Sequence, residues 1–149
     1  MREREISMSL GEAVPLIEQV TSGGGVFSLC AQGVSMQPTI IGGRDIMKLG
    51  RLDAPEKHDI VLYRRASGEY VLHRIVGMDE DGYIMCGDSQ ITLERGIARD
   101  MMIAKLVAVQ RGEKELSTVG AVNRARGRYM AFLRGVRRVR HGIAKLIRK

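Results

Sequence analysis

The sequence contains no tryptophan, and it has only two phenylalanines and four tyrosines among its 149 residues. So few aromatic rings argue against a nucleic-acid surface built on base stacking. The two cysteines, Cys30 and Cys86, are too few for a disulfide framework and lack metal-ligand spacing. No stretch approaches the roughly 18 consecutive apolar residues of a membrane span, and the charged N-terminus lacks the apolar core of a signal peptide. These absences favour a cytoplasmic protein.

Acidic residues are missing from residues 121–149, which contain ten Lys or Arg, whereas the rest of the chain has fourteen basic against seventeen acidic residues. Apolar residues recur every three to four positions in this segment, which predicts a basic amphipathic helix. Three interpretations are open. The helix contacts an anionic membrane and holds the protein peripherally on the cytoplasmic face, its apolar stripe packs on the protein itself, or, least favoured, it binds nucleic acid without sequence preference.

Hydrophobic periodicity changes along the chain. Residues 7–22 show helical spacing and end in a glycine-rich linker. Strands are predicted at residues 26–31, 45–49, 59–64, 69–78, 83–86 and 101–110, followed by a turn at 111–114 that allows a short hairpin. The run at 101–110 also allows a helix. We therefore expect a mainly β fold: an N-terminal helix and linker at 1–25, a β-rich domain at 26–117 and the basic helical tail at 118–149.

The candidate nucleophile is Ser35, in the segment G-V-S-M-Q-P-T at 33–39. A serine peptidase needs a hydroxyl on a sharp turn with a base within hydrogen-bond reach. Gly33 lets the backbone approach a substrate closely, and main-chain N–H groups beside Ser35 are placed to stabilise an oxyanion. We take Gly33 and Met36 as the candidate oxyanion or substrate-binding positions. Serine is common in turns, so this segment alone decides nothing.

Four segments then occur in a fixed order: G-V-S-M-Q-P-T-I at 33–40, D-I-V-L-Y at 59–63, V-L-H-R-I-V at 71–76 and C-G-D-S-Q at 86–90. This series resembles the signal peptidase and LexA-like superfamily of serine peptidases. The four segments match its nucleophile box, its G-D-I-V strand (with His58 in place of glycine), its base-bearing strand and its G-D-N-x loop. The resemblance covers residues 26–110 and implies a signal-peptidase or LexA-like β domain.

The resemblance implies that His73 is the general base. Most members of the superfamily carry a lysine there, whereas the endoplasmic-reticulum and archaeal signal peptidases carry a histidine. A histidine titrates near 6.5 and needs little adjustment to accept a proton at neutral pH. Val71, His73 and Ile75 share one face of the predicted strand, which places the imidazole in an apolar wall. The two other histidines, His58 and His141, are expected to face water.

The resemblance also suggests two acids that could orient the imidazole. Asp88 matches the first acid of the loop, and Glu94 stands where the histidine-type enzymes carry a second. Asp88 could instead pair with Arg74 or cap a turn. No metal and no organic cofactor is implied.

The implied function is a serine endopeptidase that cleaves a precursor or leader peptide. The lack of a membrane-spanning helix departs from the signal peptidases and puts secretory signal peptides in doubt as substrates. A LexA-like self-cleaving regulator is an alternative, although only about 25 residues precede the β domain, too few for a helix-turn-helix. A non-catalytic peptide-binding module is a second alternative.

Overall fold

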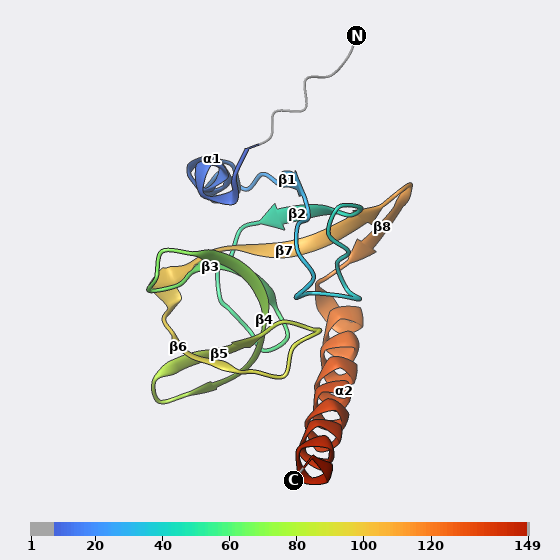
Figure 1. Ribbon diagram of the computed structural model, residues 1–149. Coiled ribbons are helices and arrows are strands. Elements are labelled where there is room, and N and C mark those ends of the chain that lie inside the picture. Colours follow the sequence, from blue (N-terminus) through green and yellow to red (C-terminus); the bar gives the residue numbers. More distant parts are fainter. Residues whose placement is uncertain (1–7, 149) are drawn as a thin grey trace.

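The computed structural model describes residues 8–148 and consists of an antiparallel sheet with a helix at each end (Figure 1). The helices are α1 (Leu10–Ser22) and α2 (Gly120–Ile147). The strands are β1 (Phe27–Cys30), β2 (Ile46–Gly50), β3 (Ile60–Arg64), β4 (Tyr70–Asp79), β5 (Gly82–Cys86), β6 (Glu94–Ile97), β7 (Met102–Arg111) and β8 (Lys114–Ser117). The expected mainly β fold with two terminal helices is confirmed. Residues 1–7 and 149 of the expected terminal segments lie outside the described residues.

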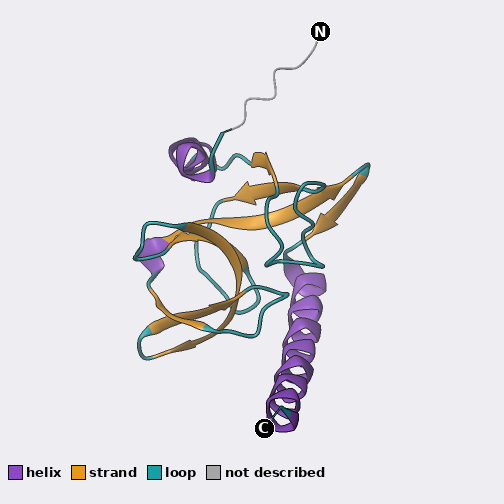
Figure 2. Ribbon diagram, in the orientation of Figure 1, coloured by secondary structure: helices purple, strands orange, loops and turns teal. Residues whose placement is uncertain are grey.

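The sheet has the strand order β1-β2-β7-β3-β4-β5-β6, and β8 pairs with β7 as a short hairpin. The run at 101–110 is a strand, because β7 pairs with β2, β3 and β8 along its length. The sheet curves strongly, so that β3, β4, β5 and β6 wind round a second core region beside the one under α1 (Figures 1 and 2). The candidate site lies where the turn after β1 and the segment after β5 approach β4.

One strand, β6, was not predicted. Its sequence, E-R-G-I, is short and polar, and it lies at the edge of the sheet, where it pairs only with β5. Edge strands need no alternating apolar pattern, since one side meets solvent. The pairing matters for the site, because it fixes the position of Glu94 opposite Met85.

The first helix begins three residues later than expected, at Leu10. Ser9 caps it: its hydroxyl accepts the N–H of Glu12 at 3.3 Å, and the Glu12 carboxylate accepts the N–H of Ser9 at 2.8 Å. This reciprocal pair satisfies two N–H groups that a helix start leaves free. The buried face of α1, including Ala13 and Ile17, packs on β1, β2 and β7.

The last helix, α2, does not turn its apolar stripe toward the domain, so the interpretation in which that stripe packs on the protein is wrong. Its buried positions are Asn123, Gly127, Met130 and Arg134. His58 is partly buried against this face, contrary to expectation: a Cβ on Gly127 would collide with its ring. His141 is exposed, as expected. Within residues 8–148, neither helix combines the length and the apolarity needed to cross a bilayer.

Candidate active site

Ser35 lies in a turn between β1 and β2 that is anchored on both sides. Met36 and Ile40 bury their side chains in the core, with 5% and 4% of their surface exposed. The Ser35 carbonyl accepts the N–H of Ser89 at 3.0 Å, and the Ser89 hydroxyl donates to the Val34 carbonyl at 2.9 Å. These contacts hold the Ser35 hydroxyl in a fixed place, which a positioned nucleophile requires.

His73 lies on β4, opposite Val61 of β3, and is 3% exposed. Its Nε2 is 3.2 Å from the Ser35 Oγ, although 38 residues separate the two in sequence. This distance is at the upper end of hydrogen-bond range, as is usual for catalytic pairs without substrate. The fold therefore brings together the two residues expected to be nucleophile and base.

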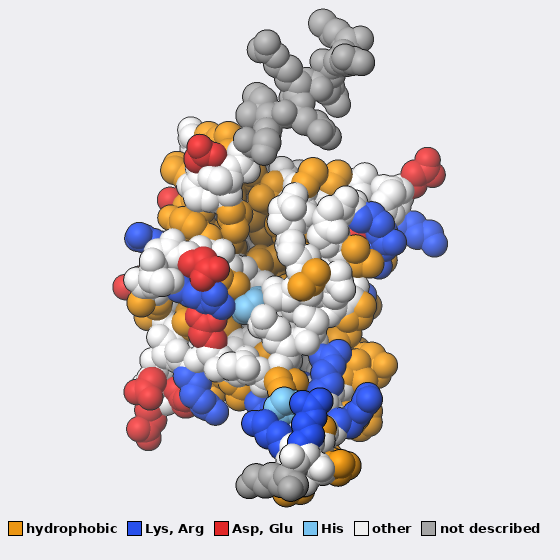
Figure 3. All heavy atoms as spheres, viewed as in Figure 1, with side chains coloured by type: hydrophobic (Ala, Val, Ile, Leu, Met, Phe, Trp, Pro, Cys, Tyr) orange, Lys and Arg blue, Asp and Glu red, His pale blue; other side chains and the backbone are white. Residues whose placement is uncertain are grey.

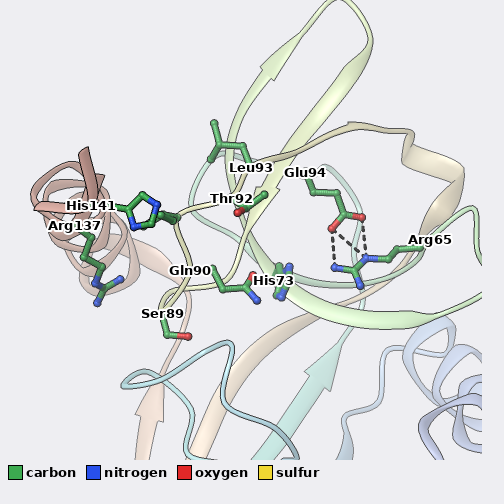
Figure 4. Close-up of a pocket in the computed structure, with 10 residues that line it drawn as sticks. Arg65, His73, Ser89, Gln90, Thr92, Leu93, Glu94, Arg137 and His141 are labelled. Carbon is green, nitrogen blue, oxygen red and sulfur yellow. Dashed lines mark hydrogen bonds and ion pairs between the residues drawn. The ribbon is translucent and has the colours of Figure 1, made fainter. Parts of the chain in front are cut away.

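The other imidazole nitrogen, Nδ1, meets a tyrosine instead of an acid. Tyr63 of β3 lies diagonally across from His73, and its hydroxyl is 3.3 Å from Nδ1. The same hydroxyl donates to Glu94 Oε2 at 2.8 Å. Arg65 in turn holds Glu94, with Nε 2.9 Å from Oε1 and Nη2 2.9 Å from Oε2 (Figure 4). Glu94, expected as an orienting acid, thus reaches His73 through Tyr63.

One placement of the hydrogen atoms satisfies the series of hydrogen bonds from Ser35 through His73 and Tyr63 to Glu94. The Tyr63 O–H donates to Glu94, so its oxygen accepts the Nδ1–H of His73. Nε2 is then free of hydrogen and accepts the hydroxyl proton of Ser35. In this tautomer His73 is a base directed at Ser35.

Asp88 does not contact His73, and the expected orienting contact is absent. Its carboxylate forms a two-point pair with Arg74, Oδ1 to Nε and Oδ2 to Nη2, both at 2.8 Å, and both side chains are fully buried. Thr39 also donates to Oδ2, at 2.5 Å. His73 and Arg74 are successive residues of a strand and point to opposite faces, which is why one acid cannot serve both. Asp88 instead joins β4 to the segment that follows Ser35, which is the alternative pairing with Arg74 considered from the sequence.

The electrostatics of the site keep the base neutral. Burial, and after it the positive charge of Arg65, lower the pKa of His73 to about 4, while Glu94 and Asp88 act in the opposite direction. Burial would raise the pKa of Glu94, but hydrogen bonds from Arg65 and Tyr63 outweigh it and leave that pKa below its usual value. At neutral pH the site therefore holds an uncharged imidazole and a charged carboxylate.

The two candidate oxyanion positions, Gly33 and Met36, differ in exposure and in which of their groups can meet a substrate. Gly33 is exposed and has φ +78°, a left-handed conformation that favours glycine. The Met36 side chain belongs to the core, so only its backbone can meet a substrate. Among the hydrogen bonds of residues 8–148, the N–H groups of Ser35 and Met36 have no acceptor. Within the described residues the N–H groups of Gly33 and Val34 lack an acceptor too, but those of Ser35 and Met36 belong to the nucleophile and its neighbour and are available to stabilise a developing oxyanion.

A cleft of about 700 Å³ opens beside His73 (Figure 4). The loop 89–94 runs through the middle of its lining, with His73 and Arg65 on one side and Arg137 and His141 of α2 on the other (Figure 4). Arg137 donates to the Asp88 carbonyl at 2.7 Å and Arg138 to the Ile91 carbonyl at 3.2 Å, so α2 supports this loop directly. A cleft of this size can hold several residues of an extended peptide.

Comparison with protein-family models, with curated proteins and with solved structures finds no match for this chain. The case for a function therefore depends on the geometry of the site.

Two residues of the site, Tyr63 and Arg65, were not predicted from the sequence. Tyr63 belongs to the D-I-V-L-Y segment, and a tyrosine in the buried part of a strand needs a hydrogen-bond partner for its hydroxyl. This need for a partner could have indicated that Tyr63 takes part in a polar site. Nothing in the local sequence marks Arg65, since its partner Glu94 lies 29 residues further along the chain.

Proposed function

We propose that this protein is a serine endopeptidase in which Ser35 is the nucleophile and His73 the general base. The observation that carries the proposal is the 3.2 Å separation of Ser35 Oγ and His73 Nε2. It is supported by the chain through Tyr63 to Glu94, which directs the lone pair of Nε2 at the hydroxyl. The order of the four sequence segments, similar to that of signal peptidases, points the same way.

In the proposed reaction, Ser35 Oγ attacks the scissile carbonyl carbon while His73 Nε2 takes the hydroxyl proton. The carbonyl oxygen becomes an oxyanion, and the N–H groups of Ser35 and Met36 stabilise it. His73 then gives the proton to the leaving amine, which departs and leaves an acyl-enzyme on Ser35. Water attacks this ester with His73 again as base, releasing the acid and restoring the hydroxyl.

Tyr63 and Glu94 act through His73, as positioning residues. When the imidazole takes up a proton, Nδ1–H stays bonded to the Tyr63 oxygen, and the carboxylate of Glu94 lies behind that hydroxyl. The negative charge stabilises the imidazolium that forms during attack. Arg65 moderates this effect by pairing with Glu94.

The proposed substrate is a precursor or leader peptide, which follows from the resemblance to signal peptidases. An extended peptide would enter along the part of the cleft that His73 lines, with its scissile bond at Ser35, whose Oγ lies 3.2 Å from the His73 imidazole. The walls of this cleft carry both charge signs and hydroxyl groups, which suits polar backbone recognition more than a deep apolar pocket.

A serine-reactive fluorophosphonate tests the proposal. We expect the wild-type protein to be labelled once and Ser35→Ala not to be labelled. Thr92→Ala is the matched control, because the Thr92 hydroxyl lines the same cleft but does not hold the Ser35 turn, so labelling should be unchanged. Unlabelled wild-type protein, or equal labelling of Ser35→Ala, would contradict the proposal. Peptide binding that survives Ser35→Ala, without cleavage by the wild type, would instead support a peptide-binding module.

A further inference from the structure

The helix α2 exposes its apolar side to solvent. Eight of its large apolar side chains recur at helical spacing on one side and are at least 40% exposed: Val122, Tyr129, Phe132, Val136, Val139, Ile143, Leu146 and Ile147. We call these residues the apolar stripe. The four positions buried against the domain lie roughly on the opposite side of the helix, at about 100° per residue. A surface helix normally shows the reverse arrangement.

The contacts of α2 with the domain prevent the stripe from turning inward. Asn123 bonds Arg74 and the His58 carbonyl, and Arg137 and Arg138 bond the loop that lines the cleft. These polar contacts fix one side of the helix over several turns. The stripe is therefore left for an outside partner, and it extends for about 38 Å from Val122 to Ile147.

Basic residues border the stripe on both sides. Arg124 and Arg128 lie along one edge and Arg126 and Arg140 along the other, judged from their helical positions. Residues 121–149 contain no acidic residue to offset them. Figure 3 shows Lys and Arg side chains gathered over α2 with hydrophobic ones between them. The partner therefore has to be apolar along a line and negatively charged on both sides of it.

Two other partners fit less well. In a symmetric dimer through the stripe, the basic edges of one copy would face those of the other, and like charges at close range oppose such pairing. A nucleic acid would neutralise the arginines but would leave the apolar side chains in water. An anionic bilayer satisfies both requirements, because acyl chains lie directly beneath its charged headgroups.

We propose that α2 docks this protein on an anionic lipid surface. The stripe enters the interface, the bordering arginines contact headgroup phosphates, and the β domain stays on the water side. The cleft is lined by Arg137 and His141 on the domain-facing side of this helix, so docking would hold the cleft roughly one helix diameter from the lipid surface. The docking itself does not depend on the proposed peptidase activity.

Co-sedimentation of the full chain with vesicles tests the proposal. We expect binding to vesicles of equal parts phosphatidylcholine and phosphatidylglycerol, weaker by tenfold or more on phosphatidylcholine alone, and weakening as salt is raised. The double variant Phe132→Ser/Val139→Ser should bind at least about 100-fold more weakly, since both side chains would be buried in the interface. Arg124→Gln/Arg128→Gln should lose roughly 30-fold.

Matched controls separate the stripe from general surface effects. Met78→Ser removes an equally exposed apolar side chain from β4, and Arg51→Gln removes an exposed arginine from the domain. Both should bind like the wild type, and so should Ser35→Ala, which keeps this test independent of the peptidase proposal. If the double apolar variant melts at a lower temperature, Val139→Ser alone should still weaken binding.

Three results would overturn the proposal. One is no vesicle binding by the wild type. Another is equal binding to neutral and anionic vesicles, or binding that Phe132→Ser/Val139→Ser does not reduce. The third is a concentration-dependent dimer, or retention on duplex DNA, in protein that does not bind vesicles.

Discussion

His73 and Arg74 are neighbours on β4, yet they lead to two polar networks that differ in almost every respect. On one face, Arg74 pairs with Asp88, and neither side chain has any exposed surface. On the other face, His73 leads through Tyr63 to Glu94 and Arg65, whose side chains are 27% and 31% exposed. Each network contains an arginine–carboxylate pair, but only the second borders the cleft.

This difference indicates how the two acids are used. A fully buried ion pair with every oxygen bonded has no free position for a substrate or a moving proton. A partly open pair can respond to charge that develops beside it. The first network therefore holds the turn that carries Ser35, and the second one sets the tautomer and the charge of His73.

The largest effect should come from breaking the buried pair. We expect Asp88→Asn to lower the free energy of unfolding by about 3 to 5 kcal/mol, because the Arg74 charge is left buried without its partner. Glu94→Gln should cost less than about 1 kcal/mol, since its ion pair is partly solvated. Urea denaturation of both variants measures the two values. Similar losses in the two variants would remove the distinction between the networks.

The next effect is a pH dependence of stability that His73, in the cleft-side network, should contribute. The pKa of His73 is lowered to about 4 by burial and by Arg65, whereas an unfolded histidine titrates near 6.5. As the pH falls from about 6.5 to 4, the unfolded chain takes up a proton that the folded chain does not. The free energy of unfolding should therefore fall with it, by about 3 kcal/mol over the whole interval.

Comparison of two histidine variants separates the contribution of His73 to the pH dependence of stability from that of other titrating groups. His73→Gln should be less sensitive to pH between 6.5 and 4, whereas His141→Gln, at an exposed position, should retain the wild-type slope. Urea denaturation at several pH values gives these slopes. A wild-type slope in His73→Gln would show that the imidazole is not held neutral by the fold.

The sequence predicted the strands best where burial imposes a pattern. The central strands β3 and β7 and the long strand β4 were recognised from their apolar residues, whereas the polar edge strand β6 was not. Ser35 and His73 were found through the resemblance of their segments. Their contact could not be derived locally, because it depends on the turn after β1 reaching β4.

Two other features depended on tertiary contacts that no local pattern encodes. Asp88 and Glu94 are both acids of one loop region, and only the direction of β4 side chains decides which one serves His73. The amphipathic pattern of α2 was read correctly, but periodicity does not say which side of a helix meets the domain. Buried polar partners such as Asn123 reversed the usual orientation.

A smaller effect should follow from removing the bridge between base and acid. Tyr63→Phe keeps the ring packing but leaves Nδ1 of His73 without its acceptor. We expect kcat for peptide cleavage to fall roughly 10- to 100-fold, a part of what a general base contributes, with KM little changed. Steady-state kinetics measure both, and Tyr83→Phe is the control because Tyr83 lies outside this chain of contacts. Unchanged kcat would show that Tyr63 only fills space.

The smallest effect should come from Glu94→Gln, in which the amide oxygen can still accept from Tyr63. We expect kcat to fall by roughly 3- to 10-fold, because the charge behind the tyrosine is lost while its hydrogen bond is kept. The Glu94 carboxylate raises the pKa of His73, so its loss should also move the acidic limb of the pH–rate profile to lower pH. Since Glu94 acts through Tyr63, Glu94→Gln should lower kcat by a smaller factor when Tyr63 is already replaced by phenylalanine. Additive losses, or an unmoved acidic limb, would show that Glu94 has only a structural role like that of Asp88.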